Sequence, residues 1–185
     1  EYALLHPLVV SRTEVHRVLV FFGGVDRDNL SGRALEALMD PALSDLAVDV
    51  VLGLQNPHRQ AVAELVARRP NTTLHSSLPS LAGLIARADL GIGAGGITTW
   101  ERACLGLPAL VVPFAANQIE GVQAFEKENC IINVSTGEFE KDLCNSLDNV
   151  VANQAWLCSA SNKSVDFADG NGTHRVLEYM FERNG

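Results

Sequence analysis

The stretch LGIGAGGITTWERACLGLPALVVPFAANQ, residues 90–118, decides the fold of this chain. It reads as a strand, a glycine-rich turn, a helix, a second strand and a polar loop, which is the order of one βαβ unit. Four glycines in six residues, Gly91, Gly93, Gly95 and Gly96, leave room for backbone N–H groups to approach a ligand. The helix after them presents unpaired N–H groups and a positive dipole end, which favours phosphate. The stretch therefore predicts a nucleotide diphosphate site with the ribose nearby.

The alternation of strand and helix continues on both sides of this stretch. Apolar runs predict strands over 17–22, 46–54, 72–75, 89–92, 110–112 and 130–134. Helical spacing predicts helices over 29–39, 57–66, 78–88, 98–105, 119–128 and from 138 onward, with a break near 169–172 and a final helix from 173 to about Arg183. We expect Asp28 to cap the first helix and Asn129 to end the fifth in the left-handed region. Such an order predicts an α/β fold, a Rossmann-like parallel sheet with helices on both faces.

Polar and glycine-rich segments follow four of the predicted strands. They are Gly23-Gly24, Gln55-Asn56, residues 93–96 and residues 113–118. Ligands of open parallel sheets bind outside the carboxyl ends of the strands. We therefore expect the four segments to converge on one crevice.

Composition narrows the classes of protein and ligand. The chain has 185 residues, enough for one domain, and a net charge of −8. That charge argues against a nucleic-acid surface, which needs a dense basic face. The longest apolar run, 107–116, is far shorter than the roughly 20 residues of a membrane helix. Four cysteines without CxxC spacing argue against a metal site and favour reduced thiols. No leader is evident, so we expect a cytoplasmic protein. We also expect no metal or redox cofactor.

Several side chains allow two interpretations from the sequence. Thr98-x-x-Glu101 fits a capping box, in which the glutamate bonds back to the first turn, but the same carboxylate suits a ribose diol. Asp26 either faces the crevice or polarises a turn, and Asn117 and Gln118 either bind a sugar or begin a helix. The spacing GxGxxG at 91–96 formally matches a dinucleotide fingerprint, but the next strand does not end in the acidic residue that NAD binding requires.

The combination of these motifs resembles a known superfamily. The matching motifs are YALL at 2–5, FGGxDxxNL at 22–30, NP at 56–57, GGxTTWE at 95–101, LGLP at 105–108, NQ at 117–118 and DGxGxxR at 169–175. In this order they resemble the C-terminal half of the GT-B nucleotide-sugar enzymes. Within that superfamily they are most similar to the UDP-sugar hydrolases of pseudaminic acid biosynthesis. The peptidoglycan N-acetylglucosaminyltransferases share the glycine turn, the glutamate and the GLP step.

The resemblance implies a set of ligand contacts. It implies that UDP contacts Gly23, Gly24, Asp26, Asn56, Gly95, Gly96, Ile97, Thr98, Thr99 and Glu101, and that the sugar or diphosphate contacts Asn117 and Gln118. Glu101 would bind the ribose, and the turn from Gly95 to Thr99 would bind the diphosphate. The family's reaction releases UDP from a UDP-linked diacetamido-trideoxy sugar and needs no metal. Its proposed catalytic histidine lies in the N-terminal half, so no catalytic residue is assigned in this chain.

The resemblance also implies a domain organisation. Residues 1–16 would be the linker from an upstream N-terminal domain, and residues 17–185 the nucleotide-sugar-binding domain. The expected partners are a UDP-sugar and that N-terminal domain, and the isolated chain is expected to be inactive. Two alternatives stay open: the donor-binding half of a GT-B glycosyltransferase, and a non-catalytic module that binds a nucleotide sugar.

Overall fold

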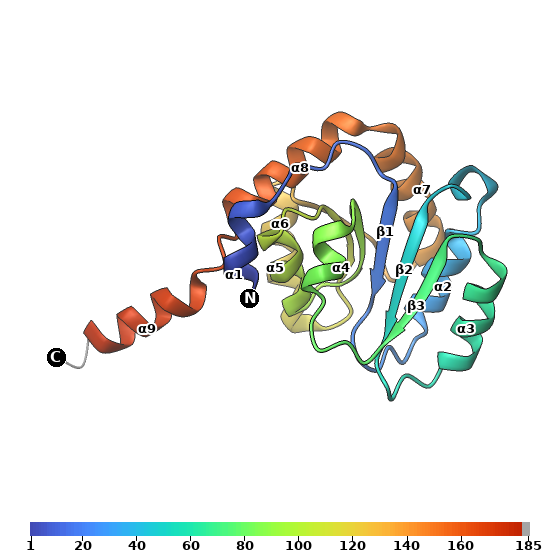
Figure 1. The fold of residues 1–185 in the computed structure, drawn as a ribbon, viewed down its shortest axis with the longest axis horizontal. Helices are drawn as coiled ribbons and strands as arrows, with labels where there is room; N and C mark the ends of the chain where they lie inside the picture. Colours follow the sequence, from blue (N-terminus) through green and yellow to red (C-terminus); the bar gives the residue numbers. More distant parts are fainter. Residues whose placement is uncertain (183–185) are drawn as a thin grey trace.

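Six parallel strands form a single sheet in the order β3-β2-β1-β4-β5-β6 (Figure 1). The computed structural model describes residues 1–182. The strands are β1 (Arg17–Phe21), β2 (Ala47–Leu52), β3 (Thr72–Ser76), β4 (Leu90–Ala94), β5 (Ala109–Val112) and β6 (Ile131–Asn133). Val18 of β1 pairs with Val48 of β2 on one side and with Leu90 of β4 on the other. The order of strands therefore reverses direction between β1 and β4. The predicted parallel α/β fold is confirmed.

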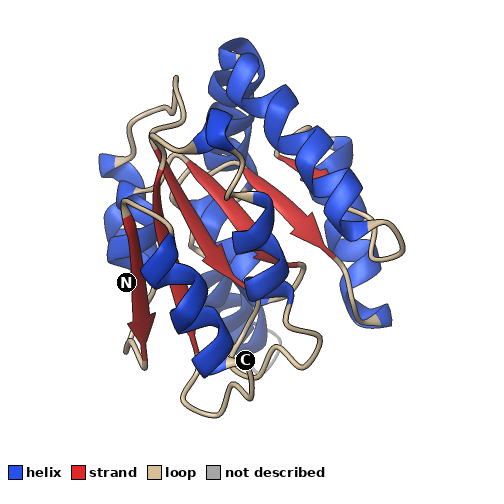
Figure 2. Cartoon of the chain, turned by 90° about the vertical axis from the view of Figure 1, so that its right-hand side faces the viewer, coloured by secondary structure: helices blue, strands red, loops and turns tan. Residues whose placement is uncertain are grey.

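Helices cover both faces of the sheet (Figure 2). One face carries α2 (Leu30–Ala37), α3 (Arg59–Arg68) and α7 (Phe139–Ala152), and the other carries α4 (Ala82–Arg87), α5 (Ile97–Cys104) and α6 (Ala116–Lys127). Alternate side chains of β1 supply both cores, because Val18 and Val20 pack on the first face and Leu19 on the second. This two-sided burial accounts for the uninterrupted apolar runs of the strands. No helix within residues 1–182 has the length and apolar character to span a membrane.

Two helix starts differ from the sequence prediction. Asp28 does not cap α2; the Asp26 carboxylate accepts from the N–H groups of Leu30 and Ser31 at 2.8 and 2.9 Å instead. Asp26 and Asn29 both have positive φ, and this tight turn brings the earlier carboxylate to the helix end. Pro57 precedes α3 rather than beginning it, because the Asn56 side chain bonds the His58 N–H at 2.8 Å and the helix starts at Arg59.

Other boundaries shift by a few residues. The helix predicted over 78–88 begins only at Ala82, since residues 77–81 form a loop at the sheet edge. The helix predicted from Ile119 already begins at Ala116. Asn129 ends that segment with φ 57°, so its predicted left-handed conformation is confirmed. The predicted end of the last helix near Arg183 lies outside the described residues.

The N-terminal helix and α8 (Gln154–Phe167) both pack against α5. The N-terminal segment forms α1 (Tyr2–Leu5), which contacts α5, and the short 3₁₀ helix η1 (His6–Leu8). α8 also packs against α7. α9 (Gly172–Glu182) then extends away from the sheet (Figure 1). Residues 1–16 therefore pack against the domain in this structure, while their expected role as a linker stays a prediction.

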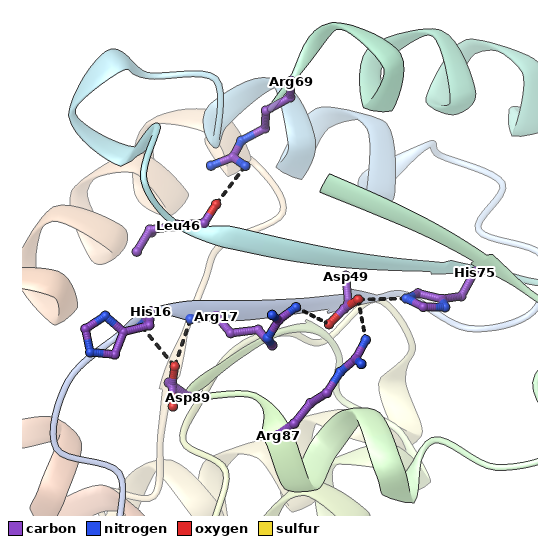
Figure 3. Close-up of polar contacts among 8 residues, drawn as sticks. All are labelled: His16, Arg17, Leu46, Asp49, Arg69, His75, Arg87 and Asp89. Atoms are coloured by element: carbon purple, nitrogen blue, oxygen red, sulfur yellow. Dashed lines mark hydrogen bonds and ion pairs between the residues drawn. The ribbon is translucent and has the colours of Figure 1, made fainter. Parts of the chain in front are cut away.

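A buried carboxylate ties three strands and α4 together. Asp49 of β2 is 1% exposed and accepts from Arg17, His75 and Arg87 at 3.1, 2.7 and 2.7 Å (Figure 3). Burial raises the pKa of Asp49, but the hydrogen bonds from its three partners outweigh burial and hold that pKa below its ordinary value. The cluster lies on the sheet face that α4 covers, opposite the larger apolar core.

Candidate functional site

The loops after β1, β2, β3 and β4 line a crevice at the carboxyl edge of the sheet. One cavity, of about 430 Å³, is bordered by Tyr2, Phe21, Gly24, Gly53, the loop of residues 77–81 and Glu101. Neighbouring hollows of about 370 and 230 Å³ lie beside the Gly23-Gly24 turn and beside Gly95-Gly96. The crevice spans the point between β1 and β4 where the strand order reverses, which is the usual ligand position in such sheets.

The start of α5 presents backbone donors to this edge. Gly96 is the N-cap residue, and within the described residues no side chain caps the helix. The first helical hydrogen bond runs from the Thr99 N–H to the Gly96 carbonyl at 3.0 Å. The N–H groups of Gly96, Ile97 and Thr98 therefore precede the ladder, at the positive end of the helix dipole. An anionic group is favoured at this position.

Only one of the four glycines in residues 90–96 leaves open space toward a ligand. A Cβ on Gly91 would lie 2.9 Å from Arg102 Cδ, and one on Gly93 would lie 2.1 Å from the Phe21 carbonyl oxygen. A Cβ on Gly95 would lie 2.5 Å from Val122. The missing side chains of Gly91 and Gly93 therefore make room for the protein itself rather than for a ligand, whereas Gly95 also borders a hollow and its ligand contact stays a prediction. At Gly96 the nearest atom would be 3.7 Å away, so that position is open.

Glu101 is half-buried and borders the 430 Å³ cavity. The capping box is not formed, because Thr98 lies inside α5 and the helix begins after Gly96. Burial raises the pKa of Glu101, and a hydrogen bond with the Tyr2 hydroxyl opposes that rise. Burial and the nearby Glu101 charge together raise the pKa of Tyr2 to about 12. The carboxylate is thus an acceptor at a cavity wall, supported by a neutral hydroxyl.

The predicted residues on the β1 and β2 loops lie close together but differ in role. A Cβ on Gly53 would meet the Gly24 carbonyl oxygen at 2.0 Å, so the two loops touch. Gly23 has φ +97°, a conformation that favours glycine. Both Asp26 oxygens bond the start of α2, and Asn56 bonds the His58 N–H while its Nδ2 is buried without a partner among the described residues. Ligand contacts by these residues stay predictions.

The predicted residues at the β4 and β5 exits surround a second hollow. Gly95, Gly96, Ile97, Asn117 and Gln118 line it together. Asn117 is exposed, whereas Gln118 Oε1 accepts from the Phe114 N–H at 3.2 Å. The buried Thr99 hydroxyl donates to the Ala94 carbonyl oxygen at 3.3 Å, so it is turned toward the protein.

Three parts of the site were not among the predicted contacts. Tyr2 bonds Glu101, the loop of residues 77–81 forms one cavity wall, and Arg102 lies buried below the glycine turn. Tyr2 stood in a matching motif without an assigned role. A charged residue inside the otherwise apolar run after Glu101 was the available signal for Arg102.

The sequence matches the glycosyltransferase family 28 C-terminal domain over residues 17–174. The chain belongs to this family. Family membership overturns the expected hydrolase activity, because the family is one of glycosyltransferases and its chemistry is transfer. The expected GT-B half is confirmed at the level of the fold and of a nucleotide-sugar glycosyltransferase-like C-terminal domain.

Named relatives of this family 28 domain agree with that assignment. The spore coat polysaccharide biosynthesis protein SpsG of Bacillus subtilis (strain 168) is 27% identical over 99% of the chain, which covers 58% of SpsG. A UDP-N-acetylglucosamine–N-acetylmuramyl-(pentapeptide) pyrophosphoryl-undecaprenol N-acetylglucosamine transferase of Exiguobacterium is 31% identical over 52% of the chain and 26% of its own length. The chain thus spans little more than half of SpsG and less of the transferase.

Solved structures show the same fold. The crystal structure of MurG from Acinetobacter baumannii aligns with a TM-score of 0.75 and 20% identity, over 91% of this chain and 52% of the MurG chain. The family 28 domain described here therefore has the architecture of about half of that molecule.

Proposed function

We propose that this chain is the donor-binding half of a glycosyltransferase that uses a UDP-linked sugar. The observation that carries the proposal is that α5 offers two different groups to one edge: backbone N–H groups at its start and the Glu101 carboxylate at the cavity wall. A diphosphate suits the first and a ribose diol suits the second. The Exiguobacterium relative, whose name contains a UDP-sugar donor, supports UDP as the nucleotide.

The two groups define an order for the donor along the crevice. With the diphosphate at Gly96–Thr98 and the ribose at Glu101, the base would lie toward the loop of residues 77–81, which walls the same cavity. The sugar would lie on the other side of the diphosphate, toward Asn117 and Gln118. Gly23, Gly24, Asp26 and Asn56 would shape the loops between these regions.

The proposed chemistry is transfer of the sugar to an acceptor. An acceptor oxygen bonds the anomeric carbon while the bond from that carbon to the diphosphate oxygen breaks, and UDP leaves with the electron pair. Negative charge grows on the diphosphate in this step, and fixed N–H donors at the start of α5 stabilise it. The proton of the acceptor passes to a base that we assign to a second domain of the full-length protein.

Because the donor site lies in this chain and the base is assigned to a second domain, we expect the activity to require the full-length protein. Orientation of reactants between two walls is worth about 7–11 kcal/mol of barrier, and this chain supplies one wall. We expect the 185-residue chain to bind a donor without releasing UDP above background, whereas the full-length protein turns over. UDP release is measured with two donors, UDP-N-acetylglucosamine and the UDP-linked diacetamido-trideoxy sugar of pseudaminic acid biosynthesis, each with and without a panel of hydroxyl-bearing acceptors, because transfer requires that turnover depends on an acceptor. A Glu101→Gln full-length variant serves as control. Robust UDP release by the short chain alone contradicts the proposal.

A further inference from the structure

Arg102 is a buried cation directly below the glycine turn. Its side chain is 3% exposed, although the residue lies one position after Glu101. Nη2 donates to the Ala94 carbonyl oxygen at 2.8 Å and to Thr99 Oγ1 at 3.1 Å. Nε is buried and has no partner among the described residues. The guanidinium therefore reaches back from α5 to the residues that precede the helix.

Two glycines of β4 make room for this side chain. A Cβ on Gly91 would lie 2.9 Å from Arg102 Cδ, and one on Gly93 would lie 2.7 Å from Nη1. Both contacts are closer than real Cβ atoms tolerate. The lack of side chains at Gly91 and Gly93 therefore lets the charged Arg102 side chain pack against β4, where an apolar side chain would be expected.

Two other buried arginines of the chain show how such a charge is usually balanced here. Arg12 donates to the carbonyls of Ile85, Ala86, Ala88 and Leu105, which are the C-terminal ends of α4 and α5. Arg69 donates to the carbonyls of Leu38, Leu43 and Leu46, and Leu38 ends α2. Helix C-termini carry partial negative charge, so both cations are favourably placed.

Arg102 itself lies in the last turn of α5, but its guanidinium reaches back to the Ala94 carbonyl oxygen and to Thr99 in the first turn of the helix. Among residues 1–182 no carboxylate lies within salt-bridge distance of it, although the chain carries a net charge of −8. Burial lowers the pKa of Arg102 to about 10, so it stays protonated at neutral pH. A buried cation without an ion pair is costly, and the charge of the neighbouring Glu101 opposes the effect of burial on the pKa of Arg102 without cancelling it. The unbalanced charge lies where an anion would offset it.

We propose that Arg102 is a positioning residue for the donor diphosphate. It holds the turn from Ala94 to Thr99 by its two hydrogen bonds, and its charge, acting through that turn, balances an anion bound at the start of α5. The inference rests on the proposed function. It adds that the charge of Arg102 makes the site prefer a ligand with a diphosphate over one without. Arg102 does not border the crevice, so the ligand is not expected to touch it.

Replacement of the charge separates this role from a purely structural one. Arg102→Met keeps much of the side-chain length and removes the charge, while Arg102→Lys keeps a charge and serves as the matched control. Affinities for UDP and for uridine, which lacks the diphosphate, are measured by calorimetry and NMR titration. We expect Arg102→Met to lose about tenfold or more in UDP affinity, with uridine affinity unchanged within about twofold. Arg102→Lys should retain most of the UDP affinity.

Each result decides between the alternatives. Equal losses for UDP and uridine, or unchanged UDP affinity, in a folded Arg102→Met variant overturn the inference. Arg102→Gln repeats the comparison if the methionine variant does not fold. The wild-type chain also tests the inference. It should bind UDP at least about tenfold more tightly than uridine, and equal affinities for UDP and uridine also overturn the inference. Failure of the wild-type chain to bind UDP at all contradicts the proposed function instead.

Discussion

Asp49 is buried and Glu101 is half-buried, and the surroundings of the two carboxylates differ. Three cationic or ionisable partners surround Asp49 and hold its pKa low, whereas Glu101 has a tyrosine hydroxyl beside it and a pKa raised by burial. A carboxylate that the fold leaves weakly compensated in a cavity is a candidate for ligand binding, whereas a saturated one stabilises the fold. These surroundings indicate that Asp49 stabilises the fold and leave Glu101 as the candidate for ligand binding.

The binding role of Glu101 leads to a prediction at this scale. Glu101→Gln removes the charge but keeps the shape, and it should weaken UDP binding by about 1.5–3 kcal/mol, the range for hydrogen bonds to charged groups. Calorimetry with UDP measures the change. Glu120→Gln, at an exposed position of α6, is the matched control and should leave UDP affinity unchanged. A normally folded Glu101→Gln variant with UDP affinity within about twofold of wild type would remove Glu101 from the proposed site.

The Asp49 cluster leads to a prediction about pH. Because the pKa of Asp49 is lower in the folded chain than its ordinary value of 3.8, its contribution to stability is present above that value. The contribution is lost as the pH falls below about 4 and the carboxylate is protonated. Asp49→Asn should lower the free energy of unfolding by about 1.5–3 kcal/mol at neutral pH and flatten its dependence on acid. Urea unfolding at several pH values tests this, and parallel curves for both proteins would contradict it.

At the scale of single elements, caps decide where helices begin. α2 begins where the Asp26 carboxylate accepts two backbone N–H groups, and α5 begins after Gly96 with no side-chain cap within the described residues. The capped start belongs to the scaffold. The uncapped start faces the crevice, where a ligand can satisfy the same kind of N–H group.

The capped start of α2 gives a direct comparison between two nearby aspartates. Asp26→Ala should destabilise the chain by about 1–2 kcal/mol, because two buried N–H groups lose their acceptor. Asp28→Ala, at an exposed position two residues away, should change stability by less than about 0.5 kcal/mol. Chemical denaturation of both variants measures the difference. Equal effects would show that the Asp26 carboxylate is not the cap.

At the scale of the whole molecule, the sequence predicts the sheet better than the site. The succession of strands and helices along the chain follows from local apolar periodicity, and the parallel arrangement follows from their alternation. That Asp26 caps α2 could not be predicted, because the cap depends on positive φ at Asp26 and Asn29, which the neighbouring sequence does not determine. The path of Arg102 across Gly91 and Gly93 depends on packing between α5 and β4, so the sequence alone did not show that these two glycines make room for a protein side chain.

The central claim is that this half contains a complete site for a nucleoside diphosphate. Micromolar affinity requires about 8 kcal/mol, and a helix N-terminus contributes only about 0.3–2 kcal/mol. Ribose and base contacts must therefore supply most of the binding energy. Calorimetry on the 185-residue chain should show UDP binding more tightly than free pyrophosphate. Equal affinities for UDP and pyrophosphate would contradict the claim, because the chain would then recognise a phosphate group without a nucleoside.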